Sequence, residues 1–242
     1  MMRAAGLQRY QRLPVAPEVF ADTVRALGRA GFRGANVTIP HKRAALAVAD
    51  TASEAAREIG AANTLTFAAG GSIAADNTDA PGLIAALGEW TPKTALVLGA
   101  GGSARAVVWA LTRAGVDVSV WNRTPERAAA LGARAVARPC PAELLVNCTS
   151  VGLARSSRDL EQLSLGSDAL GRYATVVDLV YRTGATPLIA EAARRGVRTL
   201  DGLEILVRQG ALSFTLWTGL PAPVQAMRAA VRDAPTEAPA RS

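Results

Sequence analysis

The stretch TALVLGAGGSARAVVWALTRAG, residues 94–115, decides the expected fold. Its first seven residues form a short apolar run rich in β-forming side chains, which is typical of a strand buried in a parallel sheet. Residues 103–115 follow with helical spacing of apolar residues, and Gly115 supplies a plausible stop. The stretch therefore predicts a strand, a glycine-rich loop and a helix in direct succession.

The loop carries Gly99-x-Gly101-x-x-Ala104, in the strand-to-helix context that a dinucleotide fingerprint requires. The first glycine permits a tight turn, the second lets backbone approach a pyrophosphate, and the small Ala104 allows close packing of helix on strand. The helix start, which includes Gly102 and Ser103, would face the phosphates with free N–H groups. These five residues are therefore predicted to bind a dinucleotide; the alternative is a purely structural turn.

The end of the next strand distinguishes between nicotinamide cofactors. Units that bind NAD usually present Asp or Glu about 20 residues after the loop, to hold the ribose hydroxyl. Here Asn122, Arg123 and Thr124 occupy that place, and Arg127 follows. With no carboxylate and two guanidinium groups, a 2′-phosphate would find bidentate partners, so NADP is favoured. The alternative is that Arg127 merely faces solvent.

Strands and helices alternate through the rest of this region, which predicts a Rossmann-type doubly wound parallel sheet. Strands are expected at residues 116–122, 144–150 and 175–181, and helices at 124–133 and 186–196. The region before Thr94 reads as a smaller α/β layer, with helices at 17–31, 41–49, 51–60 and 81–90, a strand at 34–39 and a hairpin at 63–77. Two more helices are expected at 204–219 and 222–234, followed by a disordered tail at 235–242.

The composition excludes several classes of protein. In 242 residues, 50% are hydrophobic and 19% are charged, which is enough to build a sizeable core. An uninterrupted apolar run of about 18 residues is missing, so no membrane span is expected. The net charge of +7 comes from scattered arginines, and only 5% of residues are aromatic, so nucleic-acid binding is not expected. Cys140, Cys148 and the single His41 do not suggest a metal site, and they fit a reducing cytoplasm.

Lys42 stands out because the chain has 25 arginines and only 2 lysines, Lys42 and Lys93. Arginine stays protonated in proteins, whereas a desolvated lysine gives up its proton more readily, so Lys42 is a candidate for proton transfer. Chance survival of two lysines is the alternative. His41 is expected only to start a helix. Gln209, in an apolar helix, requires a polar partner.

Eight short motifs follow one another along the chain: NVTIPHK (36–42), GAANT (60–64), NTDAPG (77–82), GAGGSAR (99–105), NRTPER (122–127), NCTSVG (147–152), DLVYRT (178–183) and DGLEILVRQGA (201–211). Together they resemble the shikimate dehydrogenase family, which reduces 3-dehydroshikimate to shikimate with NADPH. The resemblance implies that Lys42 is the catalytic lysine and Asp79 its partner. It further implies substrate contacts at Thr38, Asn63, Asp79, Tyr181 and Gln209, a nicotinamide contact at Gly202, and an adenosine-phosphate clamp at Asn122, Arg123 and Arg127. Asn63 and Asn77 could instead cap turns, and Tyr181 could be a packing aromatic.

The change of pattern before Thr94 divides the chain near residues 91–93, and the chain departs from the family in one respect. Residues 1–90 would form the substrate-binding domain, to which 203–242 return, and 91–202 would form the NADP-binding domain. The family's first loop, with its Ser-x-Ser motif, is not found before Asn36, so either the start is misassigned or the chain is truly short. Two alternatives follow: a quinate/shikimate dehydrogenase-like paralogue, or an NADP-binding remnant without turnover. A monomer and a homodimer are both open.

Overall fold

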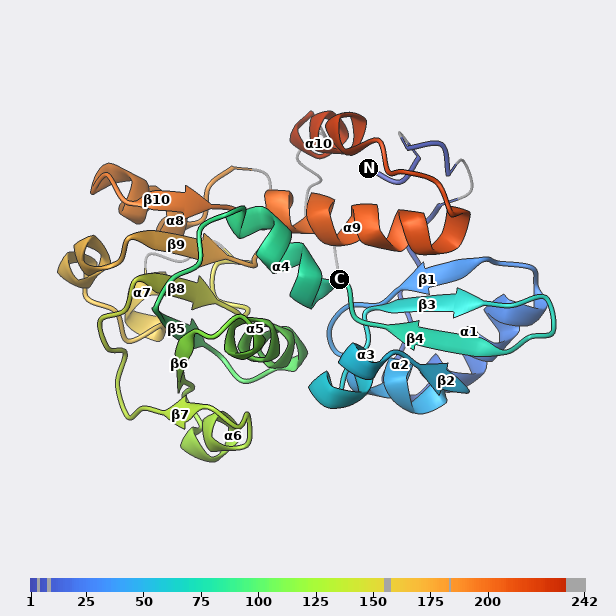
Figure 1. Cartoon of the computed structure of the whole chain (residues 1–242), viewed down its shortest axis with the longest axis horizontal. Helices are drawn as coiled ribbons and strands as arrows, with labels where there is room; N and C mark the ends of the chain where they lie inside the picture. The colour runs from blue at the N-terminus through green and yellow to red at the C-terminus, as the bar shows by residue number, and fades with distance from the viewer. Residues whose placement is uncertain (4, 8–9, 155–157, 183, 234–242) are drawn as a thin grey trace.

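The computed structural model describes residues 1–3, 5–7, 10–154, 158–182 and 184–233. Figure 1 shows two sheets lying side by side, with helices α4 (Asp79–Leu87) and α9 (Gly202–Thr218) running between them. The tail that was predicted to be disordered, residues 235–242, lies outside the described residues.

The larger sheet has six parallel strands in the order β10-β9-β8-β5-β6-β7. The strands are β5 (Thr94–Leu98), β6 (Asp117–Trp121), β7 (Arg134–Ala135), β8 (Leu144–Asn147), β9 (Thr175–Asp178) and β10 (Arg198–Leu200). The order reverses at β5 and β8, as in doubly wound dinucleotide-binding sheets, and the predicted fold class is confirmed. Ligands bind such sheets outside the carboxyl ends of the strands near this switch point.

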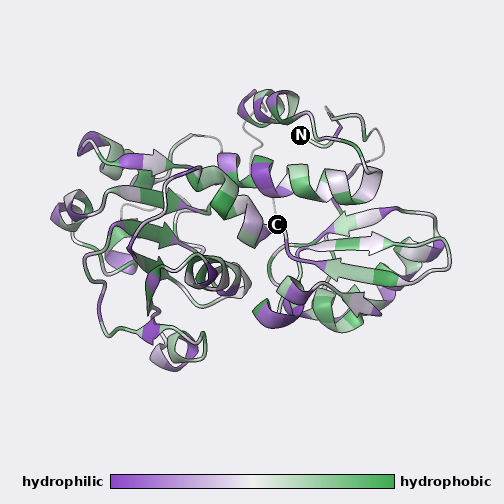
Figure 2. Cartoon of the chain, viewed as in Figure 1, coloured by the Kyte–Doolittle hydropathy of each residue, from purple (hydrophilic) through white to green (hydrophobic). Residues whose placement is uncertain are grey.

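Strand β5 shows why its sequence is apolar throughout. Ala95 and Val97 point to one face, where α4, α5 (Gly102–Arg113) and α6 (Pro125–Ala129) pack. Leu96 and Leu98 point to the other face, where α7 (Asp159–Gln162), η2 (Ser167–Arg172) and α8 (Pro187–Arg194) pack. All four side chains are buried, as expected for a strand covered on both faces. Figure 2 shows this central part of the sheet in the hydrophobic colour.

The smaller sheet is mixed, with the order β1-β3-β4-β2. Strands β3 (Thr64–Phe67) and β4 (Ile73–Asp76) form the predicted hairpin, and Gly71 in its turn has φ +82°. Strand β1 (Gly34–Asn36) pairs antiparallel with β3, and β2 (Thr51–Ala52) pairs parallel with β4. One face is covered by the apolar sides of α1 (Phe20–Arg29), α2 (Lys42–Val48) and α3 (Glu54–Ile59), and the short η1 (Pro17–Val19), whose residues are exposed, leads into α1.

The C-terminal helices complete this smaller layer, as predicted. Trp217 of α9 donates from Nε1 to the carbonyl of Leu65 on β3, at 2.9 Å. Helix α10 (Val224–Arg232) packs on α9 through Met227, which is buried beside Phe214 and Trp217. Helix α9 therefore lies against the small sheet along part of its length, while its first turn, at Gly202, lies beside the large sheet.

Several local predictions were wrong or incomplete. Residues 51–52 form strand β2 rather than helix; Ser53, whose Oγ accepts from Ala56 N at 3.2 Å, caps α3 and delays its start. The strand expected at 34–39 ends at Asn36, before Pro40, which lacks an N–H to donate. The helix expected at 124–133 ends at Ala129, and Gly132 turns the chain with φ +74°. Strands β7 and β10 were not predicted, because each has only two or three residues.

Among the described residues, no helix is both long and apolar enough to cross a membrane. The same residues contain no group of three or more His, Cys, Asp or Glu side chains that could hold a metal ion.

Candidate active site

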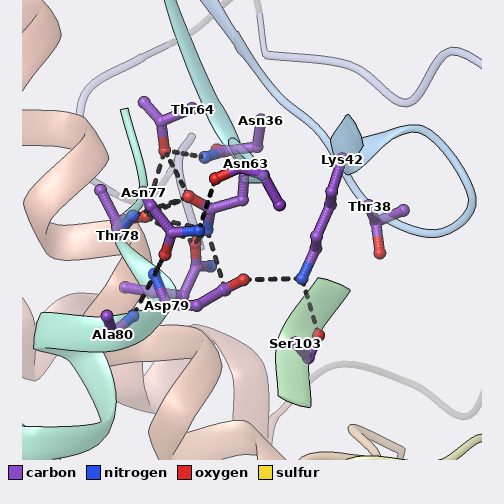
Figure 3. A network of polar contacts seen from close by, with 12 residues as sticks. Asn36, Thr38, Lys42, Asn63, Thr64, Asn77, Thr78, Asp79, Ala80 and Ser103 are labelled. Carbon is purple, nitrogen blue, oxygen red and sulfur yellow. Dashed lines mark hydrogen bonds and ion pairs between the residues drawn. The ribbon is translucent and has the colours of Figure 1, made fainter. Parts of the chain in front are cut away.

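Lys42 and Asp79 form an ion pair at the junction of the two sheets. Lys42 begins α2 and Asp79 begins α4, and the Lys42 Nζ to Asp79 Oδ2 distance is 2.7 Å. The two side chains are only 9% and 16% exposed. His41 precedes the lysine at the helix start, as expected, where Nε2–H donates to the Val15 carbonyl at 2.9 Å. Figure 3 shows the ammonium between the carboxylate and Ser103 of α5.

Asn77 holds the start of α4 and therefore orients Asp79. Its Oδ1 accepts from the backbone N–H groups of Asp79 and Ala80, at 3.1 and 3.2 Å, and its Nδ2 donates to the Ala61 carbonyl at 2.9 Å. Asn77 is thus a helix-capping residue, one of the two interpretations that its sequence allowed.

Asn63 has a different role. Its Nδ2 lies 2.8 Å from Asp79 Oδ1, 3.0 Å from Thr78 Oγ1 and 3.2 Å from Gln209 Oε1. Its Oδ1 accepts from Thr78 N at 2.7 Å. The Gln209 Nε2 donates to the Leu206 carbonyl at 3.0 Å, so the buried glutamine has the polar partners that its position requires. The network joins the carboxylate of the ion pair to both amides.

Thr38 and Tyr181 lie at the exposed edge of this region. Their hydroxyl oxygens are 3.5 Å apart, although Thr38 follows β1 and Tyr181 follows β9. Tyr181 is 47% exposed, which is unusual for a tyrosine whose purpose is packing. The structure therefore brings the two together across the junction, outside the buried network.

The glycine-rich loop lies directly against Lys42. Gly99 has φ +104°, and a Cβ there would lie 3.1 Å from Thr149 Cγ2, so a side chain is disfavoured on two grounds. A Cβ on Gly101 would meet nothing within 4 Å, which leaves its face open to a ligand. A Cβ on Gly102 would lie 3.3 Å from Lys42 Cβ and Cδ.

The predicted adenosine-phosphate clamp lies at the carboxyl end of β6. Asn122 Nδ2 donates to the Thr124 carbonyl at 2.9 Å, which shapes the turn into α6. Arg123 and Arg127 are exposed, and neither side chain forms a hydrogen bond or ion pair with any described residue. Two guanidinium groups without a protein partner, one strand away from the glycine-rich loop, suit a ligand that carries an additional phosphate.

Gly202 and Cys148 lie near the same edge of the large sheet. A Cβ on Gly202 would lie 2.4 Å from the Val180 carbonyl oxygen, so only glycine lets α9 start this close to the end of β9. Cys148 is buried behind Gly99, and burial raises the pKa of its thiol well above the usual range. The thiol is therefore no candidate nucleophile, because the thiolate is the reactive form.

Comparison with known proteins decides the family. Residues 1–65 match the family described as shikimate dehydrogenase substrate binding domain, residues 84–150 match shikimate / quinate 5-dehydrogenase, and residues 202–232 match shikimate 5'-dehydrogenase C-terminal domain. The protein named shikimate dehydrogenase (NADP(+)) of Methylobacterium radiotolerans is 46% identical over 231 residues, which cover 87% of this chain and 80% of the relative. This chain belongs to the shikimate dehydrogenase family.

Two further relatives agree. The shikimate dehydrogenase (NADP(+)) of Methanocella arvoryzae is 41% identical over 249 residues, with 93% of this chain and 87% of the relative covered. A crystal structure of shikimate 5-dehydrogenase from Thermus thermophilus, in complex with NADP(H) and shikimate, has a TM-score of 0.80 and 44% identity, and the match covers 90% of this chain and 85% of that chain.

The sequence prediction missed a second group of polar residues in this shikimate dehydrogenase, in addition to Asn63 and Gln209. The hydroxyls of Thr64, Thr78 and Ser213 lie within 2.9–3.3 Å of one another, and Asn36 Nδ2 donates to Ser213 Oγ at 2.8 Å. One signal could have found part of it: Gln209 and Ser213 are polar residues one helical turn apart on an apolar helix. The contact between Ser103 and Lys42 was also missed, since Ser103 was assigned only to the cofactor.

Proposed function

We propose that this shikimate dehydrogenase catalyses the reversible, NADPH-dependent reduction of 3-dehydroshikimate to shikimate. The observation that carries the proposal is the buried Lys42–Asp79 pair, which lies between an amide network on one side and the dinucleotide loop on the other. A proton donor, polar groups for a polyol and a cofactor loop therefore meet at one place.

The residues at the edge of the large sheet fit NADP. Gly99, Gly101 and the start of α5 would hold the pyrophosphate, and Arg123 and Arg127 would hold the 2′-phosphate. The missing carboxylate at the end of β6 removes the group that would favour NAD. When it is bound, the reduced cofactor supplies a hydride to the carbonyl carbon of the substrate.

Lys42 supplies the proton that the reduced carbonyl oxygen needs. Its ammonium group has three N–H donors, and the described residues accept two of them, through Asp79 and Ser103. The third is available to the substrate oxygen. Asp79 holds the ammonium in place through the ion pair. In the opposite direction, the neutral amine accepts the proton of the alcohol.

The substrate hydroxyls would meet groups that both donate and accept. Asn63 and Gln209 carry amides, and Thr38 and Tyr181 carry hydroxyls at the exposed edge. We infer that residues 1–90 with 203–242 bind substrate and that 91–202 bind NADP. A cytoplasmic location and a monomeric or homodimeric state complete the proposal.

The test is turnover of the purified chain, followed through NADPH absorbance with shikimate and NADP⁺, with quinate and NAD⁺ as comparison reactants. The variant Lys42→Arg keeps the charge but holds its proton too tightly, so kcat should fall by about 100-fold or more. Lys93→Arg is the matched control, because Lys93 is exposed and its side chain forms no hydrogen bond or ion pair with the described residues. A purified, folded chain that leaves shikimate unoxidised would refute the proposal.

A further inference from the structure

We propose that Ser103 is a positioning residue for Lys42, which it holds in place through both protonation states of the catalytic cycle. The inference deepens the proposed function and depends on the proton-transfer role of Lys42. It assigns to a residue of the dinucleotide loop a task directed at the lysine rather than at the cofactor.

The contact itself is short and nearly buried. Lys42 Nζ lies 2.8 Å from Ser103 Oγ, almost as close as the 2.7 Å to Asp79 Oδ2, and Lys42 is only 8% exposed as a residue. Figure 3 shows the two acceptors on different sides of the ammonium, one from α4 and one from α5. Lys42 is therefore fixed by two bonds whose partners belong to different layers of the molecule.

The neighbouring glycine keeps the loop at this distance. A Cβ on Gly102 would lie 3.3 Å from both Cβ and Cδ of Lys42, so the stem of the lysine already touches the loop backbone. The hydrogen bond to Ser103 is thus part of a continuous contact, with the apolar stem against Gly102 and the ammonium against the hydroxyl.

The chemistry of a hydroxyl explains why serine suits this place. Ionised Asp79 only accepts hydrogen bonds, so it holds the ammonium through an ion pair, which becomes a weaker hydrogen bond from a neutral amine once the proton has left. A hydroxyl both accepts and donates. Ser103 accepts from the ammonium before the transfer. The proton that leaves is the one that faces the substrate, so the N–H that Ser103 accepts stays on the amine, and if the amine turns, the hydroxyl donates to its lone pair instead. The bond of Ser103 to Lys42 therefore survives the step that weakens the bond to Asp79.

A serine that served only the cofactor would behave differently on mutation. Loss of a contact to the pyrophosphate raises the KM for NADP and leaves kcat at saturation unchanged. Loss of a contact that orients Lys42 lowers kcat at saturating NADP and substrate. It also costs nothing further once the lysine has been removed, because the two residues act as one unit.

The experiment is a double-mutant cycle with Ser103→Ala and Lys42→Met, in which single-turnover rates are measured with both reactants saturating. In the wild-type background we expect Ser103→Ala to lower the rate about 10-fold, the loss of one hydrogen bond to a charged group. In the Lys42→Met background we expect the same change to alter the residual rate less than about 2-fold. Ser103→Thr, which retains the hydroxyl, should restore most of the rate.

Ser119→Ala is the matched control, because the buried Ser119 hydroxyl on β6 also accepts from a cation, Arg134, at 2.8 Å, and forms no hydrogen bond with Lys42. Its rate should stay near that of wild type. Equal losses from Ser103→Ala in both backgrounds, or a raised KM for NADP with unchanged kcat, would overturn the positioning role and leave the proposed function standing. A wild-type rate in Lys42→Met would instead refute the proton-transfer role of Lys42, on which the inference depends, while the reaction itself would stand.

Discussion

Replacement of Asp79 by Asn tests the buried ion pair most directly. The substitution keeps the shape of the side chain but removes the negative charge 2.7 Å from Lys42 Nζ. Removal of one partner from a buried pair costs about 3–5 kcal/mol, because the other charge stays desolvated. The amide oxygen that the substitution introduces can still accept from the ammonium, which recovers about 1 kcal/mol. We therefore expect Asp79→Asn to lower the free energy of unfolding by about 2–4 kcal/mol.

Two measurements check this expectation. Urea unfolding of wild type and variant gives the stability difference, and steady-state turnover gives the catalytic loss, for which we expect about 100-fold in kcat because the proton donor loses its orientation. Asp117→Asn is the charge-matched control: Asp117 is exposed on β6 and far from Lys42, and the stability of this variant should stay within about 0.5 kcal/mol. A variant at position 79 that kept full stability and more than about a third of the turnover would refute the reasoning.

Three further expectations follow. Glu204 accepts bidentately from Arg228 and also from Arg208, and these contacts lower the pKa of Glu204 to about 2. The stability that the contacts contribute is present above the ordinary pKa of 4.5 and is lost as pH falls towards 2. Glu204→Gln should therefore flatten the acid limb of unfolding curves in that window. Gly202→Ala should destabilise by roughly 1–3 kcal/mol in thermal unfolding, because the new Cβ meets backbone. Joint replacement of Arg123 and Arg127 by Ala should raise the KM for NADP roughly 10-fold or more, with the KM for NAD little changed.

The outcomes that contradict these expectations are equally specific. An acid limb that Glu204→Gln leaves unchanged would show that its ion pairs do not stabilise the fold. Gly166→Ala is the control for Gly202, since a Cβ there would meet nothing within 4 Å and φ is already −71°; equal losses in the two variants would exclude a steric cause. Arg172→Ala removes an exposed charge far from the cofactor loop, and an equal effect on the KM for NADP would show a general effect of charge.

The sequence predicts the large sheet well because its signals are local. The run at residues 94–98 is apolar at every position after Thr94, and the structure buries it between two helical layers. Strand β7 was missed because Arg134 and Ala135 are exposed at the sheet edge, and the backbone bonds that pair them with β6 leave no pattern in the side chains. Thr51 and Ala52 were placed in a helix for a related reason: two residues are too few to show an alternation of period two.

The site was predicted less evenly. The pair Lys42–Asp79 came from the resemblance to a family, since no spacing rule joins residues 37 positions apart on two different helices. The amide of Gln209 was anticipated because a polar residue in an apolar helix needs a partner. The contact of Ser103 with Lys42 was not, because it spans 61 positions and joins two separate layers, and the pattern around Ser103 points to phosphate instead.

The choice of lysine at position 42, in a chain that otherwise uses arginine, now has a structural explanation. The stem of Lys42 passes within 3.3 Å of where a Cβ on Gly102 would lie, and its tip is enclosed by a carboxylate and a hydroxyl. A guanidinium is broader than an ammonium, and its planar fork would have to displace one of these acceptors or the loop itself. It would also keep its proton, so the substrate oxygen would receive a hydrogen bond but no proton. Under the role proposed for Lys42, fit and proton release both require lysine, and the only other lysine of the chain, the exposed Lys93, meets neither requirement.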